Sequence, residues 1–493
     1  MAGKKITKAQ RLLLLRQLSD LGYGQAESES EEKFPLRFYP VLEHLRAFDP
    51  AVVLVVGDRG TGKSELFNAV FKHDLMSTLA HHAPGIRFPS KDPSCVSWIE
   101  GYPLGQEFPD PRGLRDVLST SQRAVDLWFA YLVRRLQDRF DEESKTHLVK
   151  LLEPPGGAPD QVLRAFDAAG NAPLLALDQL DRKLSQEDRW LFVGYDELDT
   201  LGGFDWEAMA LAIRGLIGFW ASYARRWQRL RAKIFLRTDL FRRHAGLGGA
   251  DLAKLAANRA ELSWSDRNLF AVLIKRIANT SDELFQYCQG ARISFEKEQD
   301  PILGRMPRLI AAEESRRLIE RMVGPYMGAG RKKGETFRWV LAHLRDGRGV
   351  ATPRELVRLF EQAAGKEAAN DRVRSPKLLH PTALRQALED VSTDHVTQAT
   401  HEWPWIYGVH QRVEKQRLVP WSRRELENLL RQQWELSWGE TQEIRPPEKS
   451  PSEFIDYLVE LGVFRQRGKY RIDVPDIYLF GLGLRRKGGV KRK

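Results

Sequence analysis

Cysteine is nearly absent from this chain, whose 493 residues include only Cys95 and Cys288. Two isolated cysteines form neither a metal-binding motif nor a disulfide framework of the kind found in small secreted domains. The sequence also lacks an apolar run of about 18 residues that could span a membrane. No apolar segment with a cleavage site follows the basic start at residues 1–5. We therefore expect a soluble, cytoplasmic protein of a reducing compartment, with no membrane partner.

Length and charge further narrow the possible classes of protein. Hydrophobic residues make up 42% of the chain, and its length is too great for one ordinary core, so we expect roughly two to four domains. The formal net charge of +11 favours polyanionic partners, nucleic acid before membrane. Residues 485–493 carry basic side chains and no acidic one. Such a tail is either solvated or a contact for a polyanion.

The motif with the clearest chemistry joins an apolar run at residues 52–56 to a glycine-rich turn and a helix-forming segment at 65–71. It matches the pattern G-x-x-x-x-G-K-[ST] in the strand–loop–helix context that a phosphate-binding loop requires. Backbone N–H groups of such a loop surround the α- and β-phosphates, and the helix N-terminus adds its positive dipole end. Lys63 would reach the β- and γ-phosphates, and the Ser64 hydroxyl would bind Mg²⁺. The predicted nucleotide-binding residues of the loop are Gly57, Asp58, Arg59, Gly60, Thr61, Gly62, Lys63 and Ser64.

A second apolar segment, residues 190–195, ends in two adjacent carboxylates. This is the arrangement of a Walker B strand, in which Asp196 would hold Mg²⁺ and Glu197 would orient and polarise the attacking water. Gly194 and Tyr195 interrupt the usual aliphatic run. The role of Asp199 stays open between assisting the metal site and capping the next helix.

Three further segments are expected to complete a parallel sheet: a short strand at residues 95–100, a short buried strand at 233–239 and a final strand at 260–264. Ligands collect at the carboxyl ends of parallel strands, so Thr238 or Asp239 could sense the γ-phosphate or position water. The alternative is an ordinary transition from strand to loop. Arg259 precedes the final strand and is either an exposed arginine at a helix end or a residue that reaches a neighbouring subunit's phosphate in an oligomer.

The order of these elements resembles that of the AAA+ ATPases, and within them the STAND-type and replication-initiator-like branches. Residues 262–276 look like the junction between the last strand and the lid, and residues 349–356 resemble the Gly-x-Pro-Arg start of a lid helix. The resemblance covers roughly residues 45–365. It implies that Arg354 is a sensor-2 arginine contacting the γ-phosphate, the alternative being a surface arginine at a helix N-terminus. It also implies that Arg259 is the arginine finger.

Two features depart from this family pattern. The interval between Lys63 and Asp196 is far longer than in a minimal core, so an added helical module is expected at about residues 103–188. The strand end at residues 237–239 also lacks the asparagine often seen as the first sensor. Because no Asn-Lys-x-Asp element is present to read a guanine base, the expected cofactors are ATP and Mg²⁺.

The C-terminal part predicts two helices followed by a basic hairpin. Ser422 and Glu425 form the pattern of a capping box at the first helix, and residues 451–461 form the second, which ends at Gly462. Residues 463–472 read as a hairpin that turns at Gly468. This order resembles a winged helix-turn-helix. The nucleic-acid contact candidates are Arg465, Arg467, Lys469 and Arg471 on the hairpin, and Arg485, Arg486 and Lys487 in the tail.

The second helix argues against sequence-specific DNA reading. It carries Glu453, Asp456 and Glu460 and no basic side chain, so it is poorly suited to a major groove. Two interpretations stay open for this module: contact with the nucleic-acid backbone through the hairpin and tail, or a structural and protein-docking role.

The predicted fold class is α/β: a P-loop ASCE (AAA+-like) parallel-sheet core with a helical insertion, a helical lid and a C-terminal winged-helix domain. The predicted domains are an N-terminal helical extension and linker (1–45), the ATPase core (46–290), the lid (291–365) and a winged-helix-like domain with a basic tail (377–493).

The resemblance implies an ATP-hydrolysing switch that couples nucleotide state to nucleic acid or to a partner protein. Such a switch would act as a homo-oligomer at least transiently. Chains of this arrangement look like ATPases of bacterial conflict systems, including phage defence, in which the effector is a separate protein. The alternatives are an initiator- or loader-like ATPase that oligomerises on double-stranded DNA, and a nucleotide-gated scaffold that scarcely hydrolyses ATP.

Overall fold

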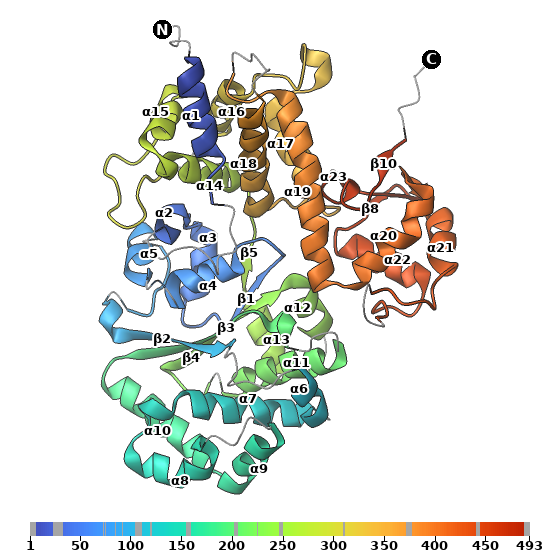
Figure 1. Ribbon diagram of the computed structural model, residues 1–493. Helices are drawn as coiled ribbons and strands as arrows, with labels where there is room; N and C mark the ends of the chain where they lie inside the picture. Colours follow the sequence, from blue (N-terminus) through green and yellow to red (C-terminus); the bar gives the residue numbers. More distant parts are fainter. Residues whose placement is uncertain are drawn as a thin grey trace. The chain divides into compact units, whose positions relative to one another are not determined.

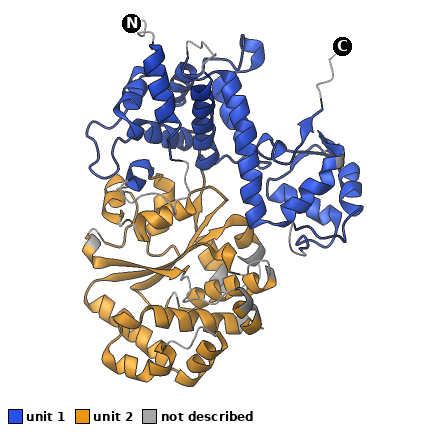
Figure 2. Cartoon of the chain, in the orientation of Figure 1, with its two compact units in different colours: residues 1–39, 264–493 blue, residues 40–263 orange. Residues whose placement is uncertain are grey.

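The computed structural model describes residues 6–22, 33–71, 73, 75–83, 85–90, 92–103, 111–118, 121–153, 159–201, 206–223, 225–245, 250–308, 311–370, 377–439 and 444–487. The chain forms two compact units (Figure 2). One unit consists of residues 40–263, and the other combines residues 1–39 with residues 264–493. Each unit is described by itself below.

A five-stranded parallel sheet forms the centre of the unit 40–263 (Figure 1). Its order is β2-β3-β4-β1-β5, so β4 separates the strand that leads into the glycine-rich loop from the strand that ends at Asp196. An additional strand at this place defines the ASCE class, and the predicted fold class is confirmed. All five strands expected from the sequence are present: β1 (Leu54–Gly57), β2 (Val96–Tyr102), β3 (Trp190–Tyr195), β4 (Leu230–Arg237) and β5 (Ala260–Leu262).

Helices cover both faces of this sheet, as Figure 1 shows. One face carries α4 (Lys63–Phe71), and near it lie α3 (Leu42–Leu45), η1 (Arg46–Phe48) and α5 (Met76–His82). Side chains alternate along β3: Phe192 packs with Trp98 on the α4 side, whereas Val193 and Tyr195 enter the larger core on the opposite side. The unit also contains η2 (Pro93–Cys95), η5 (Leu198–Thr200), α11 (Trp206–Tyr223), α12 (Thr238–Ala245) and α13 (Ala250–Ala257).

The helical insertion lies between β2 and β3, as the long interval between the two motifs predicts. Its elements are α6 (Pro111–Val117), α7 (Ser121–Arg135), η4 (Gln137–Arg139), α8 (Glu142–Leu152), α9 (Pro159–Ala169) and α10 (Ala172–Gln186). Helix α7 packs along α11, and a Cβ on Gly215 of α11 would lie 2.4 Å from the Cβ of Ala124. The insertion therefore shares one hydrophobic core with β3 and β4.

The other unit is mainly helical. Its helices are α1 (Lys8–Leu18), α2 (Phe34–Arg37), α14 (Asp266–Thr280), α15 (Asp282–Gly290), α16 (Ala312–Met322), η6 (Arg331–Lys333), α17 (Thr336–Leu344), α18 (Pro353–Ala369), α19 (Pro381–Glu402), α20 (Trp405–Val413), η7 (Glu414–Gln416), α21 (Arg423–Arg431), α22 (Pro451–Glu460) and α23 (Asp476–Leu479). Helix α1 packs on α18, where Arg11 pairs with the buried Glu367 and donates to the Leu378 carbonyl. The N-terminal helix thus belongs to this unit, with α14 and α15. The predicted domain boundaries remain proposals for subdividing the two units.

The hairpin expected near the C-terminus is present. Strands β8 (Arg465–Arg467) and β9 (Arg471–Asp473) are antiparallel, and Gly468 between them has φ +61°. The strand β7 (Trp421–Ser422) completes a three-stranded sheet in the order β7-β9-β8, and β10 (Arg485–Arg486) pairs with β6 (Leu418–Val419). The capping box at the start of α21 is also confirmed, with Ser422 and Glu425 as its two members.

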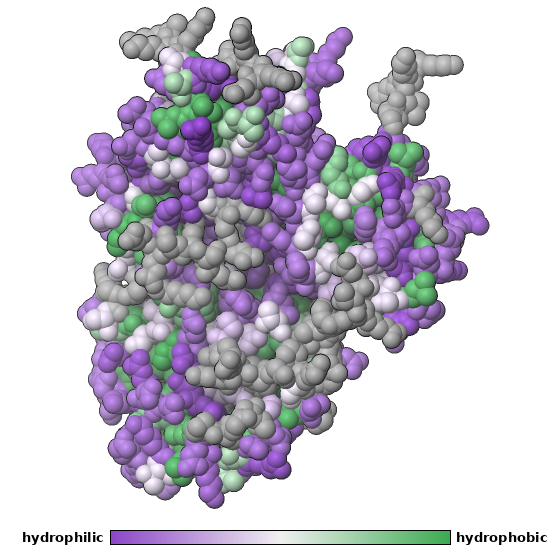
Figure 3. All heavy atoms as spheres, in the orientation of Figure 1, coloured by the Kyte–Doolittle hydropathy of each residue, from purple (hydrophilic) through white to green (hydrophobic). Residues whose placement is uncertain are grey.

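The face drawn in Figure 3 is mainly hydrophilic, with scattered hydrophobic side chains. Among the described residues, no helix combines the length and the apolar character needed to cross a bilayer.

Lys233 is a buried lysine near the start of β4 whose amine joins this strand to the segment before β1. Its Nζ donates to the carbonyls of Asp49 (2.6 Å) and Val52 (2.5 Å), and burial lowers its pKa from 10.5 to about 7. Between these two pH values the unfolded chain binds more protons at this lysine than the folded chain does. The free energy of unfolding should therefore rise with pH across this window because of Lys233.

Replacing Lys233 with methionine should remove this contribution, which amounts to about 1.4 kcal/mol per pH unit at most. Unfolding in urea at pH 7.5, 8.5 and 9.5 measures it as the difference between variant and wild type. The buried Lys275 of the other unit, whose pKa is also lowered to about 7 by burial, contributes equally to both proteins. Lys145→Met on the surface of α8 is the control. If the free energy of unfolding of Lys233→Met rose with pH as steeply as that of the wild type, the prediction would be contradicted.

Candidate nucleotide-binding site

The glycine-rich loop connects β1 to α4 and is wound by its own side chains and glycines. Gly60 (φ +71°) and Gly62 (φ +88°) occupy the left-handed region, which side chains other than glycine rarely adopt. The Thr61 hydroxyl donates to the Asp58 carbonyl at 2.7 Å. A Cβ on Gly57 would lie 2.5 Å from that hydroxyl, so the first glycine of the motif is also required sterically.

Lys63 and Ser64 form the first turn of α4. The Lys63 amine folds back over the loop and donates to the carbonyls of Gly57 (3.1 Å) and Asp58 (3.0 Å). The backbone N–H of Leu66 reaches the Gly62 carbonyl at 2.9 Å, so the helix begins within the motif itself. Loop and helix N-terminus form one continuous turn, the arrangement that binds phosphate groups.

Ser64 and Asp196 lie together although they are far apart in the sequence. Ser64 lies near the carboxyl group of Asp196, a residue that is only 4% exposed. Burial raises the pKa of Asp196, and the nearby Ser64 side chain and Lys63 charge offset this effect only in part. A buried carboxylate beside a hydroxyl supplies the oxygen ligands that Mg²⁺ prefers when it also binds phosphate. Both residues fit the predicted metal site.

Glu197 follows in a strained backbone conformation. Its φ of 54° and ψ of 28° place it in the left-handed region, uncommon for a residue with a side chain and often found at functional sites. Its carbonyl accepts from the backbone N–H (3.0 Å) and the hydroxyl (2.8 Å) of Thr200. The turn after β3 therefore holds Glu197 next to Asp196 in a defined conformation.

The close packing of α4 against β3 explains why residue 194 is a glycine, which the Walker B pattern alone did not reveal. A Cβ at this position would lie 2.4 Å from the ring of Phe71 and 2.7 Å from that of Phe67. These rings stack with their centroids 4.3 Å apart on the β3 side of α4. The glycine therefore admits α4, which carries Lys63, against the strand that ends at Asp196.

Arg237, at the end of β4, is a residue of the site that sequence reasoning missed. Its guanidinium is 5% exposed and bridges Asp199 (3.1 Å) and Asp239 (2.8 Å). Burial would raise the pKa of Asp239, but the charge and hydrogen bonds of Arg237 outweigh it, and the pKa is lowered. In the sequence, the signal that could have indicated Arg237 is a cation at the end of an apolar strand, between two acidic segments.

The Asp199 carboxylate pairs with Arg237, and the two roles that the sequence left open for Asp199 stay predictions. Thr238 is the first residue of α12, and Asp239 is held by the same arginine. The γ-phosphate sensor role of Thr238 or Asp239 stays a prediction.

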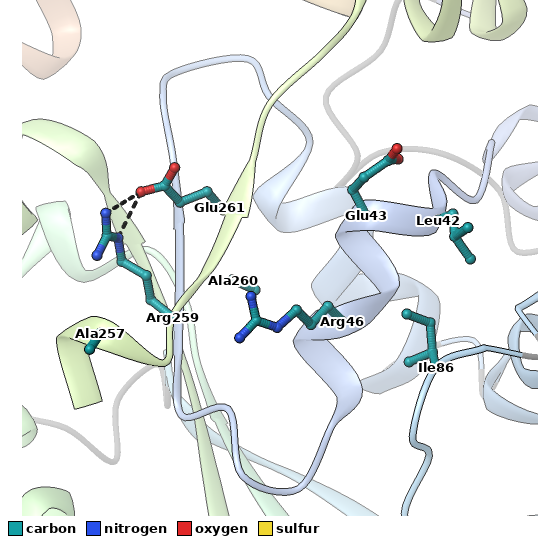
Figure 4. A pocket seen from close by; sticks show the side chains of 8 residues that line it. All are labelled: Leu42, Glu43, Arg46, Ile86, Ala257, Arg259, Ala260 and Glu261. Atoms are coloured by element: carbon teal, nitrogen blue, oxygen red, sulfur yellow. Dashed lines mark hydrogen bonds and ion pairs between the residues drawn. The ribbon is translucent and has the colours of Figure 1, made fainter. Parts of the chain in front are cut away.

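Arg259 lies beside β5 at one wall of a pocket of about 570 Å³ (Figure 4). Its Nε donates to the Glu261 carboxylate at 2.8 Å, its Nη1 donates to the Ala256 carbonyl at 2.7 Å, and its guanidinium lies 5.1 Å from the centre of the Phe241 ring. Arg46 from η1 lines the same pocket and donates to Asn258. Within one chain Arg259 is thus bound internally, and its function as a finger stays a prediction.

Arg354 belongs to the other unit, in the first turn of α18, where its Nη1 donates to Gln398 at 3.0 Å. Its sensor role is likewise a prediction.

The seven predicted nucleic-acid contacts divide into two groups. Arg465, Arg467 and Arg486 converge on the buried carboxylate of Asp473, at 3.5, 2.7 and 2.8 Å. These arginines hold the hairpin to β10. The other four are exposed and lie outside this cluster: Lys469, Arg471, Arg485 and Lys487. Arg467 and Arg486 of the cluster are also exposed. Residues 488–493 of the predicted basic tail lie outside the described residues.

No protein-family model matches this sequence, and no curated protein matches it. Solved structures do match. A Walker-type ATPase of Pyrococcus abyssi aligns with a TM-score of 0.39 and 12% identity, covering 95% of this chain and 100% of that one. The ORC2 protein of Aeropyrum pernix aligns with a TM-score of 0.37 and 11% identity over 91% of each chain. Cdc6p of Pyrobaculum aerophilum has a TM-score of 0.27 and 12% identity, with coverage of 98% and 94%.

The class of the protein follows from its own geometry. The additional strand β4, the glycine-rich loop after β1 and the adjacent carboxylates after β3 define a P-loop fold of the ASCE type.

Proposed function

We propose that this chain is an ATP-binding and ATP-hydrolysing switch that couples its nucleotide state to nucleic acid or to a partner protein. The observation that carries the proposal is the placement of Ser64 and Lys63 beside the buried carboxyl group of Asp196, with Glu197 directly after it. A phosphate-binding loop, a pair of metal ligands and a candidate for water activation thereby share one end of the sheet.

Each of these side chains has a distinct task in the proposed reaction. The loop N–H groups and Lys63 bind the phosphates, and Ser64 and Asp196 hold Mg²⁺, which neutralises the charge that develops on them. Glu197 orients the attacking water and accepts its proton as the oxygen approaches the γ-phosphorus atom. Lys63 must leave the carbonyls of Gly57 and Asp58 to reach the phosphates, so nucleotide binding is expected to rearrange the loop.

For the partner, we favour the backbone of double-stranded DNA at the exposed part of the hairpin. Lys469 and Arg471 flank Tyr470, which is 65% exposed, at the turn between β8 and β9. Exposed cations on a protruding hairpin contact phosphates without reading bases. The same surface supports the alternative of an initiator-like ATPase that assembles on DNA. A defence-system ATPase acting on a separate effector would instead respond to a protein.

The test measures DNA affinity from 50 to 200 mM salt, with ATP turnover recorded in parallel. The double variant Lys469→Ala/Arg471→Ala should reduce the slope of log affinity against log salt by about 2, because each phosphate contact contributes about 0.9. Arg331→Ala/Lys332→Ala, on the exposed helix η6, is the matched control and should keep the slope. An unchanged slope in the hairpin variant would exclude the hairpin as the contact. Turnover unaffected by DNA would favour a protein-triggered switch.

A further inference from the structure

A chain of hydrogen bonds links the end of β2 to the backbone of Glu197. The Thr200 hydroxyl donates to the Glu197 carbonyl at 2.8 Å, and the Tyr102 hydroxyl lies 2.7 Å from the same Thr200 oxygen. A threonine hydroxyl has a single proton, so Tyr102 must be the donor in the second bond. Tyr102 therefore orients Thr200, and Thr200 fastens the carbonyl of the strained residue.

Tyr102 also holds the residue before Glu197. Its backbone carbonyl accepts from the N–H of Asp196 at 3.1 Å, across from the last residue of β3. Tyr102 is 8% exposed, and burial is the main cause that raises the pKa of its hydroxyl, with the charges of Glu197 and Asp199 adding to the effect. Through one main-chain and one side-chain contact, this tyrosine fixes both carboxylate-bearing residues.

The helical insertion contacts the same tyrosine through Trp128 of α7. The Trp128 ring lies edge-on to Tyr102 (6.2 Å between centroids, 83° between planes) and to Tyr195 (5.5 Å and 88°). Its Nε1 donates to the Ala212 carbonyl of α11 at 2.8 Å, and the residue is 1% exposed. A movement of α7 must therefore move the residue that precedes Asp196 and the residue that orients Thr200.

We propose that Tyr102 is a positioning residue for Glu197 and that the insertion controls hydrolysis through the contact of Trp128 with Tyr102 and Tyr195. This proposal rests on the proposed ATPase function. A left-handed backbone at a residue with a side chain persists only where neighbouring groups impose it. In a close-packed core, a helix shift is transmitted to its contacts rather than absorbed. An event on the insertion surface would thus alter the position of Glu197 without touching the nucleotide.

The first test removes single hydroxyl groups from the hydrogen-bond chain. Tyr102→Phe and Thr200→Val should each lower kcat of ATP hydrolysis about tenfold while leaving the Kd for ATP and the melting temperature close to wild type. Thr200→Ser, which keeps the hydroxyl, should restore kcat. Tyr131→Phe is the matched control, since this tyrosine of α7 is equally buried and its pKa is raised to about 12 by burial. In a Glu197→Gln background, Tyr102→Phe should cause no further loss.

The second test addresses the insertion. Trp128→Phe should also lower kcat, as Tyr102→Phe does, whereas Trp227→Phe should leave kcat unchanged. Trp227 is also 1% exposed and also donates through Nε1, to Asp178 at 2.9 Å, but its aromatic contacts are Phe219, Trp220 and Tyr223. Wild-type kcat in both Tyr102→Phe and Thr200→Val would overturn the positioning role. Equal losses in the two tryptophan variants would overturn the role of the insertion. A wild-type protein that binds ATP without hydrolysing it would instead refute the proposed function.

Discussion

Replacing Glu197 with glutamine should lower ATP turnover by about 1,000-fold and leave ATP binding unchanged. A positioned general base contributes roughly 10²–10⁴ to a rate, and glutamine keeps the shape of glutamate without its basicity. The backbone of Glu197 is held by Thr200 through its carbonyl, so the substitution leaves that hydrogen bond in place. Binding should survive because the loop and Lys63 hold the phosphates.

Phosphate release and equilibrium binding of ATP, measured on the same preparations, give the two quantities. Glu143→Gln, an exposed residue in the first turn of α8, is the control for the chemical change. A variant that hydrolyses ATP at the wild-type rate would show that Glu197 does not activate water. Equal, negligible rates in wild type and variant, with intact binding, would favour the nucleotide-gated scaffold.

Lys63→Ala should weaken ATP binding by roughly 10- to 100-fold. A hydrogen bond to a charged group is worth about 1.5–3 kcal/mol, and each 1.4 kcal/mol corresponds to a factor of ten in affinity. The net contribution of Lys63 to ATP binding is smaller than one such bond, because Lys63 first gives up its hydrogen bonds to the carbonyls of Gly57 and Asp58. The loss should be larger for ATP than for ADP, since the lysine is expected to reach the β- and γ-phosphates.

Titration calorimetry with ATP, ADP and adenosine separates these contributions, and adenosine should bind both proteins equally. Lys145→Ala on α8 is the control, and melting temperatures without ligand show whether the loop change alters the fold. Unchanged ATP affinity in Lys63→Ala would remove the glycine-rich loop from the proposed site.

Much of the site could be anticipated because its parts are local in sequence. The loop from Gly57 to Ser64 depends on glycines at fixed spacing between a strand and a helix, and this short-range pattern is readable without tertiary information. The pair Asp196 and Glu197 is equally local, as it directly follows an apolar run. The same holds for the capping box at Ser422, whose two partners are three residues apart.

Other features depend on residues that meet only after folding. Arg237 is recognisable as part of the site once β4 lies between β1 and β3, which brings its guanidinium to Asp199. The basic residues of the hairpin and tail looked equivalent in the sequence, but only some of them pair with the buried Asp473. Helix α1 joins the unit of α18 by packing against that helix, with an ion pair between Arg11 and Glu367, whose partners are distant in the chain.

The amino-acid order alone thus specified the glycine-rich loop, the adjacent carboxylates, the five strands and the presence of an inserted helical module, since each is encoded by spacing or periodicity over a few residues. Tertiary structure alone decided which charges neutralise one another and which side chains support Glu197. These outcomes follow from strand order and from packing across the sheet, where Tyr102, Thr200 and Trp128 come together from three separate segments. Long-range contacts of this kind leave no local pattern in the sequence.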